Sequence, residues 1–137
     1  MARNITLAQA EAIVEACKAE AHVVGQPMTI AVVDDGANLV AFCAMDGTKL
    51  IGVDISQKKA LTAVYFQSDT RDLGPLVQPG QPLYGIESTT EGRLVVFGGG
   101  VLLKTASGEV AGGVGVSAGT VETDHQVAEA GRAAFDG

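Results

Sequence analysis

The chain has 137 residues, of which 47% are hydrophobic and 18% charged, and this size and composition predict one globular domain over residues 1–137. Its net charge of -7 and pI of about 4.6 argue against nucleic acid or an anionic membrane as a partner. Phosphate binding requires clustered Lys and Arg, whereas the nine basic residues here are scattered.

The N-terminal stretch MARNITLAQAEA lacks a continuous apolar core, and no later segment approaches the roughly 20 apolar residues of a membrane span. We therefore expect a cytoplasmic protein. The two cysteines, Cys17 and Cys43, have neither CxxC spacing nor a His-rich neighbourhood. We expect reduced core thiols and no metal site.

A first helix is predicted from Thr6 to about Val24, because apolar residues recur at spacings of three and four along this stretch. Gly25 and Pro27 end it. His22 lies on the neighbouring polar stripe, so we expect its ring to be solvated unless another subunit covers it.

Two β-rich runs follow on either side of residues 35–38, whose turn-forming composition predicts a hairpin. The first run, residues 29–33, is nearly all apolar and predicts a central strand.

Helical spacing returns over residues 51–66. On this helix Lys59 shares a stripe with Ile55, Thr62 and Phe66, which places an ammonium against an apolar face.

Residues 68–89 hold three of the four prolines and predict one short helical turn, capped near Asp69 or Thr70, followed by a long ordered loop. Beyond the loop we expect three strands and a last helix, over residues 94–97, 101–105, 110–117 and 120–135. The complete order predicts an α+β fold with a five-stranded antiparallel sheet. It lacks the βαβ alternation of a Rossmann fold.

The glycine-rich stretch GGVGVSAGTVETDH, residues 112–125, does not match a phosphate-binding fingerprint, because its glycines fall inside the predicted strand. Gly113 and Gly115 are instead expected to let a helix or another backbone approach closely. Asp124 is predicted on the buried side of the last helix's first turn, as a structural clamp or a catalytic acid. His125 is expected on the outer surface.

Lys59 is a candidate catalytic residue, because burial lowers the pKa of an amine and suits it to proton transfer or Schiff-base chemistry. The alternative is a structural pairing of its ammonium with Asp34, Asp46 or a carbonyl at the end of the sheet. Asp34 and Asp46 end two successive strands, so we expect both at one mouth of the sheet, as acid and base or as turn formers.

A glycine triplet offers bare backbone N–H groups that suit an anionic oxygen, or else forms a simple kink between strands. Three further side chains flank the long loop and are expected to close a pocket against the triplet. The glycine triplet is Gly98, Gly99 and Gly100. The three flanking side chains are Tyr65, Tyr84 and Glu87.

Four stretches together resemble one known family. IAVVDDGANLVAFCAMDG resembles its VvDxxGxlxxfxRMDGA pattern, QKKALTA its xxKAxtA, VVFGGGVLL its ixGGvPl, and GGVGVSAGTVETDHQVAEAG its GxiGVSGgxxxxDexiAxAg. The chain is identified as similar to the GlcG/HbpS-like family, which also includes the C-terminal domain of PduO-type proteins. The resemblance covers nearly the whole chain and implies profilin-like α/β/α layers and a homo-oligomer.

The resemblance implies a small-ligand-binding protein, with haem as the candidate cofactor. His22 is then the best available axial ligand, and Ser117 and Asp124 are further ligand-binding candidates in the last motif. A second implied function is a cofactor-independent lyase or isomerase acting on a small aromatic or carboxylated compound, similar to hydroxylaminobenzoate lyases. A non-catalytic oligomeric accessory protein is the third.

The chain departs from the family pattern at three places. Ala44 stands where the pattern has Arg, Leu102 where it has Pro, and Ala118 where it has Gly. The loss of the Arg removes a planar cation suited to pairing with a carboxylate or a haem propionate.

Overall fold

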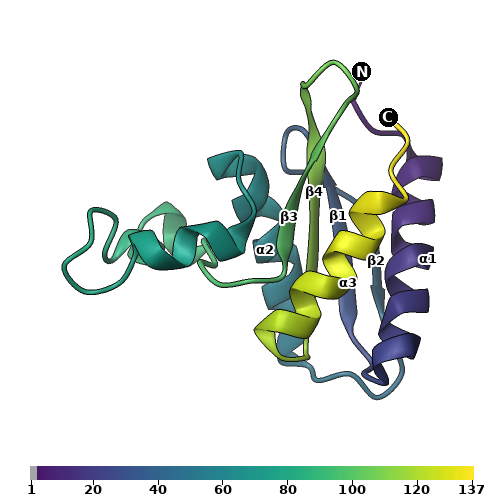
Figure 1. Cartoon of the computed structure of the whole chain (residues 1–137), viewed down its shortest axis with the longest axis horizontal. Coiled ribbons are helices and arrows are strands. Elements are labelled where there is room, and N and C mark those ends of the chain that lie inside the picture. The colour runs from purple at the N-terminus through teal and green to yellow at the C-terminus, as the bar shows by residue number, and fades with distance from the viewer. Residues whose placement is uncertain (1–2) are drawn as a thin grey trace.

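The structure, a computed structural model, describes residues 3–137 and is built on one antiparallel sheet of four strands (Figure 1). The strands are β1 (Thr29–Asp34), β2 (Leu39–Ala44), β3 (Gly100–Lys104) and β4 (Val110–Ser117), in the spatial order β2-β1-β4-β3. The predicted hairpin is confirmed, since β1 pairs with β2. The predicted central place of β1 is also confirmed, because β4 pairs with its other edge.

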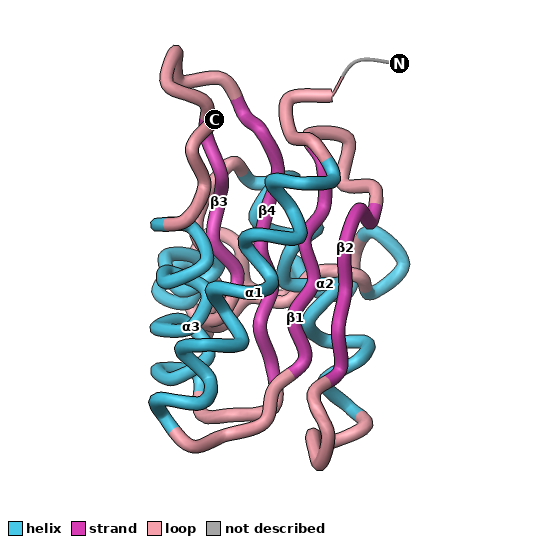
Figure 2. Tube along the Cα trace, turned by 90° about the vertical axis from the view of Figure 1, so that its right-hand side faces the viewer, coloured by secondary structure: helices cyan, strands magenta, loops and turns pink. Residues whose placement is uncertain are grey.

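Three α-helices cover the two faces of the sheet. The helices α1 (Leu7–Val24) and α3 (Val121–Ala133) lie side by side on one face, and α2 (Ile51–Phe66) covers the other (Figure 2). The predicted arrangement of an antiparallel sheet between layers of helices is therefore confirmed. Among the described residues, no helix combines the length and apolar content needed to cross a membrane.

The ends of α1 and α3 are set by local sequence. Thr6 forms a capping box with Gln9 at the start of α1, and Gly25 ends this helix in the left-handed conformation. The Thr120 hydroxyl accepts the N–H of Thr123 at the start of α3. These caps fix where each helix meets the sheet.

The larger part of the core lies between the sheet and the pair α1 and α3. Alternate residues of the central strands face it, among them Ile30, Val32, Val114 and Val116. The opposite face of β4 carries glycines against α2. A Cβ on Gly113 would lie 2.5 Å from the Ala60 carbonyl oxygen, and one on Gly115 would collide with the carbonyl of Ser56. The predicted close approach is confirmed.

The predicted fifth strand, over residues 94–97, is wrong. This segment is largely buried, but side chains satisfy its backbone groups instead of a neighbouring strand: the Val95 N–H donates to the Thr62 hydroxyl and the Phe97 carbonyl accepts from the Thr70 hydroxyl. An apolar run that packs against a helix has the same composition as a strand.

The predicted helical turn and loop contain two 3₁₀ helices, η1 (Thr70–Leu76) and η2 (Ile86–Ser88), and a third, η3 (Thr90–Gly92), follows directly after them. Figure 1 shows this segment projecting from the end of α2 away from the sheet.

Candidate functional site

The ammonium of Lys59 is enclosed at the centre of the molecule. Its Nζ donates to the carbonyl oxygen of Val116 at 2.8 Å and to Asp124 Oδ2 at 2.9 Å, and lies 5.2 Å from the centre of the Phe97 ring. The side chain of Lys59 is 0% exposed and that of Asp124 3%. This buried pair connects α2, β4 and α3, and we call it the Lys59–Asp124 clamp.

Backbone geometry makes room for the clamp. Gly99 has a φ of 125°, and a Cβ there would lie 2.5 Å from Lys59 Nζ. The second oxygen of Asp124, Oδ1, accepts the N–H of Gly119 at 2.9 Å. Both partners are thus held by backbone groups as well as by each other.

Burial moves both pKa values of the pair toward neutrality. Burial lowers the pKa of Lys59, which the charge and hydrogen bond of Asp124 partly restore. Burial raises the pKa of Asp124, which Lys59 and the Gly119 N–H partly lower again. The enclosure favours the structural alternative for Lys59. The expected carbonyl at the end of the sheet is present, that of Val116, but the acid that pairs with Lys59 is Asp124, not Asp34 or Asp46.

The expectation that Asp34 and Asp46 share one mouth of the sheet is wrong. Asp34 ends β1, while Asp46 follows the end of β2, and the two strands run antiparallel. The C-terminal ends of β1 and β2 therefore lie at opposite ends of the sheet, as measured along the strands. Asp34 is a buried turn former that accepts the backbone N–H groups of Gly36 and Asn38, whereas Asp46 is exposed.

The three candidates around the long loop do not gather against the glycine triplet. Tyr84 and Glu87 are exposed in the projecting segment. Tyr65 is exposed on α2 and has the Arg93 guanidinium 5.5 Å from its ring centre. The expected pocket closed by these residues does not form in the described structure.

The glycine triplet performs mainly structural tasks. The Gly100 N–H donates to the Thr70 hydroxyl at 2.9 Å, and the Gly99 carbonyl accepts the Val116 N–H at 2.9 Å. Gly98 lines a cavity of about 410 Å³, which we call the Gly98 cavity. Ser117 is buried at the end of β4, where its carbonyl accepts the Thr29 hydroxyl.

His125 also lines the Gly98 cavity, and its predicted surface position is wrong. Its ring is enclosed, with Nε2 2.7 Å from a Glu129 oxygen and Nδ1 without a hydrogen-bond partner among the described residues. The hydrogen bond from His125 lowers the pKa of Glu129. No local pattern around His125 indicates this burial, because residues 71–98 reach the helix only in the folded chain.

Asp69, His125 and Glu129 form a polar cluster. Each offers one atom that could bind a metal, and these three atoms lie within 4.8 Å of one another. Arg132 donates to both carboxylate oxygens of Asp69, at 2.8 and 3.0 Å. Burial raises the pKa of Asp69, but the Arg132 and Leu102 hydrogen bonds outweigh it and lower that pKa overall. The Arg132 guanidinium therefore already supplies this cluster with a positive charge.

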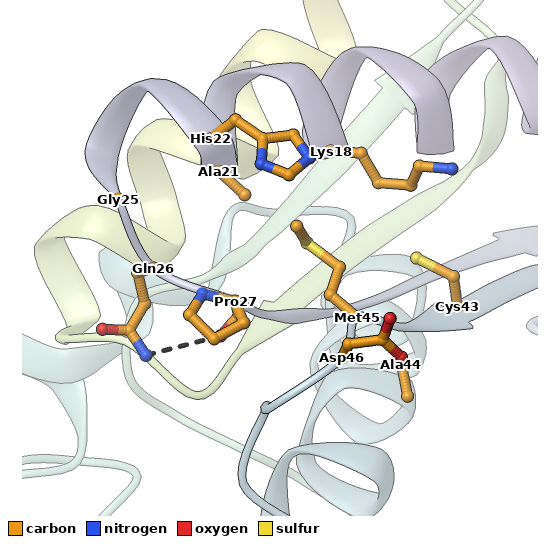
Figure 3. Close-up of a pocket in the computed structure, with 10 residues that line it drawn as sticks. All are labelled: Lys18, Ala21, His22, Gly25, Gln26, Pro27, Cys43, Ala44, Met45 and Asp46. Carbon is orange, nitrogen blue, oxygen red and sulfur yellow. Dashed lines mark hydrogen bonds between the residues drawn. The ribbon is translucent and has the colours of Figure 1, made fainter.

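His22 lies at a groove between the end of α1 and the chain that follows β2. The groove has a volume of about 600 Å³, and we call it the α1–β2 groove. Figure 3 shows the exposed His22 ring projecting from α1 and Met45 pointing toward the same helix. Lys18, Cys43 and Ala44 also line the groove. Lys18, Cys43 and Met45 were not among the predicted ligand-binding residues, because only the tertiary fold brings the end of β2 next to α1.

Comparison with known proteins supports the resemblance seen in the sequence motifs. The family model described as "Haem degrading protein HbpS-like" matches residues 5–133. The chain belongs to the HbpS-like family. A 15.0 kDa protein of the dhaT-dhaS intergenic region of Citrobacter freundii is 41% identical over 126 residues, which are 92% of this chain and 88% of that protein.

Two further similarities concern PduO. The corrinoid adenosyltransferase PduO of Citrobacter freundii is 39% identical over 110 residues, which are 80% of this HbpS-like chain but only 32% of PduO. The chain thus spans about a third of that relative. The crystal structure of a PduOC:heme complex matches with a TM-score of 0.91 and 33% identity, covering 95% of this chain and 94% of that one.

Proposed function

We propose that this HbpS-like protein binds haem in the α1–β2 groove, with His22 as the axial ligand. The observation that carries the proposal is an exposed imidazole at the rim of a groove whose size is typical of ligand sites. The family description and the PduOC:heme complex support haem as the ligand.

The donor set of the groove suits haem iron through His22 more than through Cys43. An imidazole binds iron as a neutral group, so it needs no deprotonation at neutral pH. The thiol must lose its proton before it becomes a strong ligand. Burial raises the pKa of Cys43 and keeps it in the thiol form. Met45 and Pro27 offer apolar surface for the porphyrin.

The propionates of haem require a cation or exposure to water. Ala44, at the position of the family's Arg, lines this groove and offers no charge. Lys18 lines it too, with its ammonium 2.7 Å from Glu15 Oε1 on the helix surface. We assign Lys18 to the propionates, since a flexible exposed lysine can exchange one carboxylate for another.

Bound haem would supply an iron centre for redox or ligand chemistry, and the chain's residues would set its access to water. His22 would fix the iron at the end of α1. Met45 and Pro27 would cover apolar porphyrin surface, and Lys18 would orient the propionate edge.

Haem titration of the purified protein, followed by the Soret band, tests the proposal. The wild type should give a saturable shifted band that His22→Ala abolishes. The matched control is His125→Gln, which changes the other of the two histidines and should leave the band unchanged. Circular dichroism verifies that both variants fold.

Two results contradict the assignment. One is a Soret shift that survives in His22→Ala, and the other is a shift lost only in His125→Gln. Lys18→Gln should weaken haem binding about tenfold, as loss of a charge-assisted contact does. The exposed Lys49 lies outside the groove, so Lys49→Gln should bind like the wild type.

A further inference from the structure

We propose that the open edge of β2 binds an extended, basic segment of a partner protein, which adds a strand to the sheet. β2 lies at one edge of the sheet and β3 at the other (Figure 2). Backbone N–H and C=O groups that have no partner on an edge strand can pair with a second extended chain. The two edges of this sheet differ in whether side chains already use these groups.

Side chains close the edge formed by β3. The Gly100 N–H donates to the Thr70 hydroxyl at 2.9 Å, and the Leu102 N–H donates to Asp69 Oδ1 at 3.0 Å. The carbonyl of Leu102 accepts from Arg132. The outward groups of β3 are therefore occupied within the chain, and a further strand would have to displace these bonds.

The edge of β2 is open. The Met45 N–H donates to the Met28 carbonyl, which continues the register of β1 and β2. Residues of an antiparallel pair alternate between bonding inward and facing outward, so the N–H and C=O groups of Phe42 and Ala44 point away from β1. These groups have no hydrogen-bond partner among the described residues. β2 also carries no charged side chain or proline that would deter pairing.

A groove beside this edge offers room for side chains. It lies between the first half of α1 and residues 40–43 of β2, has a volume of about 340 Å³, and we call it the edge groove. Leu7 and Val14 give it apolar surface, and Leu7 is 51% exposed. Successive side chains of a strand point to opposite faces of the sheet. A strand paired with β2 would therefore place every second side chain against the edge groove.

The acids of the edge groove select a basic side chain. Glu11 and Glu15 line it, and Lys18 is held 2.7 Å from Glu15. Glu11 takes part in no ion pair among the described residues. A lysine or arginine of the added strand would cover Leu7 with its stem and reach Glu11 with its charge. The net charge of -7 attracts a cationic segment over longer distances as well.

A second copy of the chain matches the edge groove less well. It would bring another β2 to the edge, and its Ala41 and Cys43 on that face are small and packed into their own core. β2 carries no cation to balance Glu11, and two chains of charge -7 repel each other. A basic strand of a different protein meets both requirements.

Fluorescence anisotropy tests the site on the haem-free protein. The probe is a labelled peptide of alternating valine and lysine, as long as the six residues of β2. We expect a Kd of about 0.1 mM, and at least about tenfold weaker binding when glutamate replaces lysine. Glu11→Gln should weaken binding about threefold through the loss of one exposed charge pair. Glu122→Gln on α3 is the matched control, because this exposed acid lies outside the edge groove.

Methylation of peptide amides tests the strand pairing without altering the protein. In an antiparallel pairing, the residues opposite Phe42 and Ala44 turn their N–H groups toward β2 and their side chains toward the face where Phe42 packs. The lysines that reach the edge groove alternate with them and point their N–H groups away. N-methylation of the valines should therefore weaken binding at least about tenfold, whereas N-methylation of the lysines should change it by less than about twofold.

The position of the bound peptide is measured by ¹⁵N NMR. The amides of Phe42 and Ala44 should shift, and those of Gly100 and Leu102 at the closed edge should not. The proposal is overturned if both methylated peptides bind equally, or if the glutamate peptide binds as tightly as the lysine peptide. It is also overturned if the Phe42 and Ala44 amides shift when the protein alone is diluted, because a second copy then occupies the edge. The test needs no haem and does not involve His22, so failure of either proposal leaves the other standing.

Discussion

Replacing Asp124 with asparagine removes the carboxylate that faces a fully buried ammonium. The side chain keeps its size, and its amide oxygen can still accept the Gly119 N–H that Asp124 Oδ1 accepts. The amide cannot balance the charge of Lys59, which is 0% exposed. The lysine must then either stay charged without a partner or lose its proton.

The free-energy cost of each outcome can be calculated. Removing one partner of a buried ion pair costs about 3–5 kcal/mol. Deprotonation sets a ceiling, because holding a lysine with an ordinary pKa of about 10.4 neutral at pH 7 costs about 4.6 kcal/mol. We therefore expect Asp124→Asn to lower the free energy of unfolding at pH 7 by about 3–4.6 kcal/mol.

The next residue on α2 offers a matched control. Lys58 Nζ lies 2.9 Å from Asp54 Oδ2, the same separation as in the Lys59–Asp124 clamp, but these side chains are 33% and 60% exposed. Asp54→Asn should lower the free energy of unfolding by about 0.5 kcal/mol or less, since water screens the pair. Urea unfolding followed by circular dichroism measures both variants.

The reasoning is refuted if Asp124→Asn and Asp54→Asn lower the free energy of unfolding equally. A double variant provides a second check. Lys59→Met combined with Asp124→Asn removes the stranded charge, so it should be more stable than Asp124→Asn alone. A double variant that is no more stable would show that the packing of Asp124, not its charge, is what matters.

Three other predictions follow from the same structure. Asp69→Asn should lower the free energy of unfolding at pH 7 by about 1–3 kcal/mol. Because the folded-state pKa of Asp69 lies below its ordinary value, the wild type should lose this stabilisation as the pH falls below about 4, and the variant should not. Urea unfolding at several pH values measures this difference, and an equal loss of stability in both proteins would contradict it. Iodoacetamide should alkylate Cys43 before Cys17, because Cys17 is buried and burial raises its pKa to about 12. Bound haem should protect Cys43 from alkylation. Mass spectrometry measures the order of alkylation, and modification of Cys17 first would contradict the prediction. Gly115→Ala should cost at least about 2 kcal/mol in urea unfolding, whereas Gly74→Ala, whose nearest neighbour is 3.8 Å away, should cost less than about 0.5 kcal/mol; equal costs would contradict the close approach of α2 to β4.

The boundaries of the helices were predictable because their signals are local. The Thr6 cap, the Gly25 stop and the apolar spacing between them all lie within one helix. The α2 bounds, Ile51–Phe66, agree with the prediction from residue spacing alone, since this helix has no side-chain cap and ends at Gln67. The inward stripe of α2 also predicted the burial of Lys59.

The partner of Lys59 was not predictable in the same way. Asp124 lies 65 positions later in the chain, and periodicity shows which face a residue occupies but not which element packs on it. The separation of Asp34 from Asp46, by contrast, was implicit in the hairpin. Consecutive antiparallel strands end at opposite edges, so the sequence already contained the evidence against a shared mouth.

The haem site proposed in the α1–β2 groove should not respond when the Lys59–Asp124 clamp is broken. The clamp binds Asp124 in α3 to Lys59 in α2, and the ammonium also contacts Phe97. The α1–β2 groove is lined from α1, β2 and their adjoining loops, none of which the ammonium contacts. In Asp124→Asn, the haem titration should therefore keep its midpoint even though the fold is less stable. A weaker haem titration in this variant would mean that the clamp supports the whole sheet, including the face that α1 covers.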